Sequence, residues 1–100
     1  MAEIPELRRH AVEYMTWGYS GAITGAVEVS LDDGETWLAT ESVPENPKGF
    51  RILFAGSLAE AVAGATVLEP GVYKCVARVK ETPEIIQREA GFIRALNDGY

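Results

Sequence analysis

The sequence predicts a small all-β domain, an antiparallel β-sandwich of about seven short strands. Residues 26–31 and 36–40 are two alternating runs on either side of an Asp-Gly turn, which is typical of a β-hairpin. Residues 72–80 alternate apolar and polar side chains, as a half-buried antiparallel strand does. Turn residues recur about every 8–12 positions, a spacing that favours a sandwich over a barrel or βαβ units.

The other elements follow from similar patterns along a chain of 100 residues, a length that fits a single domain. Residues 1–10 are polar around Pro5 and are expected to form a short N-terminal arm, followed by one sandwich domain at 11–100. Apolar or alternating runs predict further strands, at 11–17, 50–55, 66–68, 85–86 and 92–96. Glycines and prolines predict loops at 18–25 and 41–49, whereas 56–64 fits either a helical turn or a surface loop. Gly91 indicates a bulge or bend between the last two strands.

The turn of the predicted hairpin carries the pattern S-x-D-x-G-x-x-W, which begins at Ser30 and ends at Trp37. It resembles the Asp-box hairpins of sialidase propellers and of the Ig-like domain in sulfite oxidases, where the motif is structural. Asp32 can accept backbone N–H bonds, Gly34 permits the backbone reversal, and Trp37 can pack over the turn. We therefore interpret the motif as a folding element rather than a site of chemistry.

Residues 71–75, Gly-Val-Tyr-Lys-Cys, resemble the corner before the sixth strand of immunoglobulin-like (Ig-like) domains. In that corner a tyrosine two residues before the cysteine bonds back to the chain upstream. Tyr73 would be this tyrosine and Cys75 the core position. A plain strand with an aromatic residue is the alternative, but the neighbouring predicted strands favour an Ig-like sandwich.

Two segments contain candidate partner contacts. Ile85 and Ile86 are adjacent on a predicted late edge strand, so one would face the core and the other solvent, where it could meet a partner. A strand buried on both faces is an equally good interpretation. Arg88 on the same segment, and the adjacent pair Arg8 and Arg9 in the arm, complete the candidate contacts.

The charge balance and the cysteine content exclude several classes of protein. The net charge is −6 and the nine Lys and Arg residues are scattered, so nucleic-acid binding is not expected. Cys75 is the only cysteine, so no intrachain disulfide forms and a reducing compartment is expected. The first residues contain no apolar signal-peptide region, and Glu60 interrupts the longest apolar stretch, so neither secretion nor membrane insertion is expected.

No residue combination points to catalysis, a cofactor or a metal. His10 is the only histidine and lies in the polar arm, while Cys75 is predicted to point into the core, where a thiol is inert. A Ca²⁺ site at Asp32, Asp33 and Glu35 would have fewer ligands than an EF-hand loop provides. The chain is therefore expected not to be an enzyme.

The order of these features resembles a group of small structural proteins of phages that infect actinobacteria. The resemblance runs over residues 13–96, and the segments 56–64 and 97–100 depart from it. The matching features are Glu13-Tyr14, Ile23-Thr24-Gly25 before Val27-Glu28-Val29, Thr36-Trp37, Pro70-Gly71-Val72-Tyr73, and Val79-x-x-Thr82-Pro83-Glu84 leading to Ala90-Gly91.

The resemblance implies a virion protein: an Ig-like module, assembled in the bacterial cytoplasm, that decorates the capsid surface as a minor capsid component or lies in the head-to-tail (neck) region as a connector. Its partners would be other phage structural proteins, bound by many copies in a symmetric assembly, where avidity strengthens modest contacts. Two other classes stay open. One is a carbohydrate- or ligand-binding β-sandwich, with Trp17 and Tyr100 as candidate exposed aromatics, and the other is an accessory domain separated from an enzyme.

Overall fold

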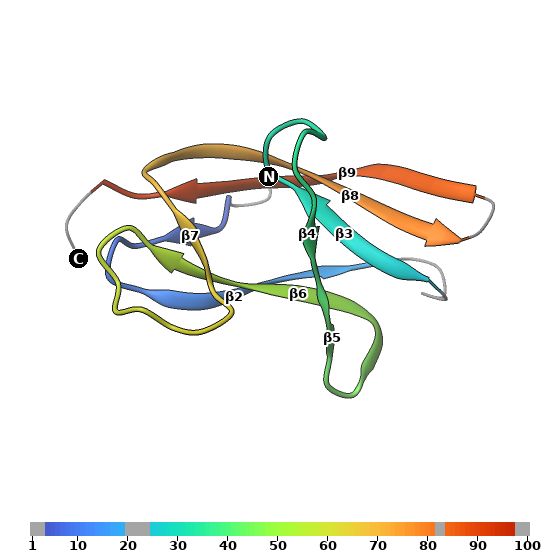
Figure 1. Cartoon of the computed structure of the whole chain (residues 1–100), viewed down its shortest axis with the longest axis horizontal. Coiled ribbons are helices and arrows are strands. Elements are labelled where there is room, and N and C mark those ends of the chain that lie inside the picture. Colours follow the sequence, from blue (N-terminus) through green and yellow to red (C-terminus); the bar gives the residue numbers. More distant parts are fainter. Residues whose placement is uncertain (1–3, 20–24, 82–83, 98–100) are drawn as a thin grey trace.

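The computed structural model describes residues 4–19, 25–81 and 84–97, and within these ranges the chain is all-β, with nine strands in two sheets (Figure 1). The described residues contain no helix that is long and apolar enough to cross a membrane. The all-β prediction is confirmed. The strand count exceeds the predicted seven because short strands form in two segments that were expected to be an arm and a loop.

The first sheet has five strands and is a strongly curled, mixed half-barrel. In spatial order its strands are β1 (Glu6–Leu7), β9 (Glu84–Ala95), β8 (Gly71–Glu81), β3 (Ala26–Ser30) and β4 (Leu38–Ala39). The long β8–β9 hairpin forms its centre and reaches one end of the molecule (Figure 1). All pairs in this sheet are antiparallel except β1 and β9, which run parallel.

The second sheet has four strands built around β6 (Asn46–Gly56). On one side β6 pairs antiparallel with β2 (Val12–Gly18). On the other side it pairs antiparallel with β5 (Glu41–Val43) and then, further along, parallel with β7 (Thr66–Leu68). The chain passes between the sheets at Thr40, where β4 of the first sheet leads into β5 of the second (Figure 1).

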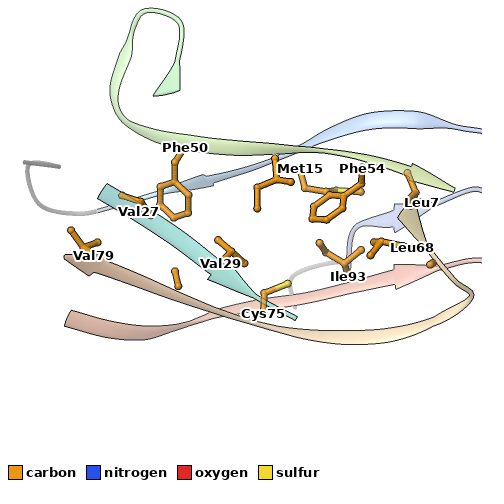
Figure 2. Packing of buried hydrophobic residues seen from close by; sticks show 13 residues of the cluster. Leu7, Met15, Val27, Val29, Phe50, Phe54, Leu68, Cys75, Val79 and Ile93 are labelled. Carbon is orange, nitrogen blue, oxygen red and sulfur yellow. The ribbon is translucent and has the colours of Figure 1, made fainter. Parts of the chain in front are cut away.

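The core lies between the two sheets, because alternate residues of each strand point inward. Figure 2 shows Phe50, Phe54 and Met15 of the second sheet facing residues of the first sheet such as Cys75 and Ile93. The fully enclosed side chains, none more than 1% exposed, are Phe54, Leu7, Ile93, Val29, Cys75 and Ser30. The strand alternation that predicted 72–80 therefore results from burial of one face.

The antiparallel Ig-like sandwich was wrong in two respects: the first sheet is a curled half-barrel, and two strand pairs, β1–β9 and β6–β7, run parallel. The N-terminal arm also needs correction over its described part, residues 4–10. Leu7 in β1 is fully buried, and Arg94 of β9 donates its backbone N–H to the carbonyl oxygen of Pro5, next to β1, at 2.9 Å. Leu7 supplies the physical reason, since its apolar side chain gains free energy on entering the core.

Three predicted boundaries changed. The expected loop 41–49 is a tight hairpin, because Pro44 and Glu45 form its turn and Pro47 lies near the start of β6, where a missing N–H is tolerated. The two expected strands at 85–86 and 92–96 are one strand, β9. It contains the bulge that Gly91 predicted, with φ of 84°, where the register to β8 shifts. In the segment 56–64, Gly56 ends β6 and the other residues form turns and irregular chain, so the surface loop rather than the helical turn is observed.

Candidate protein-interaction surface

The Asp-box turn after β3 is held by hydrogen bonds among its own residues. The hydroxyl of Ser30 donates to the Asp32 carboxylate at 2.7 Å and accepts the N–H of Gly34 at 2.8 Å. The same carboxylate accepts the N–H of Thr36 at 2.8 Å, and this bond, followed by the one from Ser30, lowers the pKa of Asp32. Gly34 has a φ of 89°, in the region that glycine favours. Every polar group of the network is used within the turn, which suits a structural role.

Trp37 belongs to a charged cluster on the outer face of the first sheet. The Arg78 guanidinium lies over its ring, 4.0 Å from the centroid, and also contacts the carboxylate of Glu28 at 2.8 Å. Lys80 contacts that carboxylate at 3.0 Å, and the hydrogen bonds from Lys80 and Arg78 lower the pKa of Glu28. This cluster fastens the hairpin to β8.

Tyr73 and Cys75 lie at the start of β8 as parts of the framework. The Tyr73 hydroxyl donates to the carbonyl oxygen of Glu69, four residues upstream, at 2.7 Å. Cys75 is fully buried, and burial raises the pKa of its thiol to about 11. A thiol with such a pKa is protonated and unreactive at neutral pH.

The two arginines of the N-terminal segment differ in their contacts. Arg9 donates to the Ser57 hydroxyl at 3.3 Å and to the Asn97 side chain at 3.1 Å, so it connects both ends of the chain to the body. Arg8 is exposed, and its carbonyl oxygen accepts the N–H of Ala11 at 3.1 Å. Of the two, Arg8 has the more accessible side chain for a partner.

The three candidates on β9 lie along the unpaired edge of the first sheet. Ile85 is 62% exposed on the outer face beside Lys80, whereas Ile86 is half-buried and Arg88 is exposed. Burial of this strand on both faces was therefore wrong. Among the described residues β1 pairs only with Arg94 and Ala95, so β9 has a free edge over residues 84–89, which we call the β9 edge.

Two further apolar side chains on the same outer face were missed in the sequence. Val72 is 59% exposed and Phe92 47% exposed, and they occupy diagonal positions on β8 and β9. These two side chains form what we call the outer patch, while Ile85 lies seven residues away from Phe92 on the same face of β9, beside Lys80. The ion pair between Lys74 and Glu89, at 3.1 Å, lies on the same face. The alternation in residues 72–80 does indicate the outward direction of Val72, because Val72 is on the same face of the strand as Lys74.

A small apolar groove opens where the edges of the two sheets approach each other. It has a volume of about 240 Å³ and is lined by Ile4, Met15, Trp17 and Phe92, among others. Trp17 stacks on Phe50, with ring centroids 5.7 Å apart, and its indole N–H donates to the carbonyl oxygen of Ala90. Trp17 is thus committed to internal contacts and is not the free aromatic that a sugar-binding face would need; the other candidate, Tyr100, lies outside the described residues.

A second depression, of about 370 Å³, lies beside the exposed ring of Tyr14. The guanidinium of Arg51 covers that ring at 3.8 Å and pairs with Glu41 at 2.7 Å. Its wall combines one aromatic ring with a satisfied ion pair. His10, the only histidine, is exposed and does not line this depression.

Within the described residues no group of three or more His, Cys, Asp or Glu side chains is arranged to hold a metal ion. Comparison of the chain with protein-family models, curated proteins and solved structures found no match. The exposed surface is therefore the remaining evidence on function. Its outer patch and the β9 edge lie on one hairpin, formed by β8 and β9.

Proposed function

We propose that this chain is a structural protein of a phage virion, a β-sandwich module that binds the capsid surface or the head-to-tail region as a decoration or minor capsid component. The family part of this proposal rests on the sequence resemblance over residues 13–96. The association part is carried by one structural observation, the exposed apolar outer patch of Val72 and Phe92.

The outer patch has the properties of a contact surface between proteins. Its side chains project from two long, paired strands, so little conformational entropy is lost when a partner covers them. Valine and phenylalanine side chains that are about half exposed, as Val72 and Phe92 are, gain free energy on burial. The neighbouring ion pair of Lys74 and Glu89 supplies the polar rim that such interfaces have.

Repeated copies would give this modest surface a useful strength. A module that contacts a symmetric lattice at many equivalent positions gains avidity without any large individual interface. The acidic net charge of −6 suits contact with protein rather than with packaged DNA. A head-to-tail connector uses the same association chemistry but forms a ring, so copy number distinguishes the two positions.

Binding of a small ligand or a carbohydrate is the second candidate, favoured by the depression beside Tyr14. A sugar would need the ring face that Arg51 covers, so binding there requires the guanidinium to move. This candidate predicts a measurable affinity in glycan arrays and a loss of that affinity in Tyr14→Ala.

The proposal is tested by co-sedimentation with phage heads, using heads of an actinobacterial phage whose structural genes include this chain. We expect the protein to bind at a fixed stoichiometry and Val72→Asp to weaken binding by about tenfold or more, since a charge enters the contact. Val67→Asp is the matched control, because Val67 is 60% exposed, about the same as Val72 at 59%, but lies on β7 of the other sheet.

Each result has one meaning. Binding that is lost in Val72→Asp and kept in Val67→Asp supports the outer patch. Equal loss in both variants contradicts the assignment of the patch. A native protein that does not sediment with heads, necks or complete particles contradicts the virion proposal.

A further inference from the structure

The β9 edge offers a row of backbone N–H and C=O groups that can pair with another strand. Such an edge is a template for strand addition unless it is short, covered or blocked by proline. In the described residues β9 runs for twelve residues from Glu84 to Ala95, and β1 covers only the last two. The uncovered part lies toward the tip of the β8–β9 hairpin, at one end of the molecule (Figure 1).

The residues of the β9 edge are complementary to themselves in one antiparallel register. Residues 84–88 read Glu-Ile-Ile-Gln-Arg. When two copies pair about Ile86, Glu84 of each copy lies opposite Arg88 of the other, and Ile86 lies opposite itself. We propose that the β9 edge binds a second copy of this chain in this register, so that the first sheets of two copies form one continuous sheet.

The pairing obeys the alternation of side chains across a sheet. Glu84, Ile86 and Arg88 share one face, because they pair with Glu81, Val79 and Ala77 on β8. Residues directly opposite in an antiparallel pair share a face, so a two-fold symmetric pair joins inner face to inner face. Two ion pairs then flank an isoleucine pair on the inner face, and Ile85 meets Gln87 on the outer face.

The neighbouring registers lack this complementarity. Pairing about Gln87 would place Ile86 opposite Arg88 and Ile85 opposite Glu89. Pairing about Ile85 would place Ile86 opposite Glu84. Both registers place Ile86 of each copy opposite a charged side chain of the other, whereas opposite charges and paired isoleucines are each stabilising across strands.

The contact between the two copies is small, and its two-fold symmetry limits the assembly to a dimer. Five residues of paired strand span about 17 Å, and a two-fold contact uses the same surface on both copies, so it does not propagate into a filament. An interface of this size belongs to the weak class, and we expect a dissociation constant of roughly 10 µM to 1 mM. In the single chain the Arg88 guanidinium donates to the carbonyl oxygen of Gln87 at 3.0 Å, an exposed contact that a carboxylate can replace.

The first test is the mass of the purified chain by sedimentation equilibrium, from about 10 µM to about 2 mM, a range that brackets the expected constant. We expect the mean mass to rise with concentration between 10.9 kDa and twice that value and never to exceed the dimer mass. Hydrogen exchange at high concentration should slow at amides of residues 84–88. A mass of 10.9 kDa throughout the range overturns the proposal.

Charge reversal tests the partner and the register together. Arg88→Glu and Glu84→Arg each place like charges opposite one another twice, and each should raise the dissociation constant about tenfold or more. The double variant restores both pairs and should restore association. Lys48→Glu is the matched control: it changes the net charge as Arg88→Glu does, from an exposed position in β6.

Three further outcomes contradict the proposal. If the Arg88→Glu variant still dimerises as the native chain does, the contact lies elsewhere. If Lys48→Glu weakens dimerisation as much as Arg88→Glu does, the effect comes from net charge and not from the proposed register. Failure of the double variant to associate rules out the register, provided its circular dichroism matches the native protein. None of these results depends on phage heads, so the pairing and the virion proposal succeed or fail separately.

Discussion

The indole N–H of Trp17 in β2 donates a hydrogen bond to the carbonyl oxygen of Ala90 in β9, at 2.9 Å, and so joins the free edges of the two sheets. Ala90 and Gly91 lie in the bulge, where two residues of β9 stand opposite Cys75 of β8. The indole therefore fastens the bulged part of β9 to the second sheet.

Trp17→Phe removes this bond while keeping an aromatic ring against Phe50. We expect the free energy of unfolding to fall by about 1 kcal/mol, the usual net contribution of one hydrogen bond. Trp17→Ala also removes the ring contact and should cost about 3 kcal/mol. Urea unfolding of the three proteins measures both differences, and a Trp17→Phe variant as stable as the native protein would show that the bond contributes nothing.

Gly56→Ala tests the attachment of β1. A methyl group at Gly56 would collide with the backbone carbonyl groups of Arg8 and Arg9, which cannot yield as a flexible side chain would. We expect a loss of about 2–3 kcal/mol, in the upper range for an overpacked site. Since the collision also displaces Leu7, the double variant Leu7→Ala/Gly56→Ala should cost less than the sum of the single ones. Additive costs in urea unfolding would contradict this coupling.

Gly91→Ala isolates the conformation of the bulge. Gly91 has a φ of 84° and no heavy atom within 4 Å of an added Cβ, so the cost is one of backbone strain alone. We expect roughly 1–2 kcal/mol of destabilisation. Gly18→Ala is the control, because it meets equally open space and its φ is outside the positive region, and it should be within about 0.5 kcal/mol of the native protein. Similar thermal midpoints for both variants would refute the strain argument.

Asp32→Asn should destabilise the protein in a pH-dependent manner. Hydrogen bonds from Thr36 and then Ser30 hold the pKa of Asp32 below its ordinary value of 3.8. A lowered pKa in the folded state gives stability that is complete above pH 3.8 and is lost as the pH falls through the folded-state pKa. Thermal unfolding should show a gap between native and variant proteins at neutral pH that closes in acid.

The control for this pH series is Asp33→Asn, which removes the same charge from the same turn. Asparagine accepts the φ of 60° at this position. A gap for Asp32→Asn that stays constant across the acid range would contradict the assigned hydrogen bonds.

The elements that could be predicted from the sequence are those whose partner is close along the chain. The hairpin containing Ser30, Asp32 and Trp37 was predicted because its turn chemistry and its alternation lie within fifteen residues. The alternation also predicted the inward-facing side chains of residues 72–80 on β8. Local physical chemistry determines both.

The parallel pairs could not be predicted, because no local pattern encodes a distant partner. β1 is two residues long, and its hydrogen bonds run to a strand at the other end of the chain. Pro44 and Pro47 indicated a loop, but both fit the tight hairpin that is observed. Pro44 lies in its turn, and Pro47 is the second residue of β6, which begins at Asn46. The outer patch was incomplete for a related reason, since Val72 and Phe92 become neighbours only when β8 and β9 pair.

The parallel pairing of β1 with β9 also has a consequence for how the protein is made. Glu6 and Arg94 are 88 positions apart, and their side chains meet at 3.5 Å. A ribosome therefore presents Leu7 to the cell with an apolar side chain that has no complete binding site until residue 95 has emerged. The core of this domain therefore closes only after β9 has emerged, so its folding is expected to wait for synthesis of its last strand.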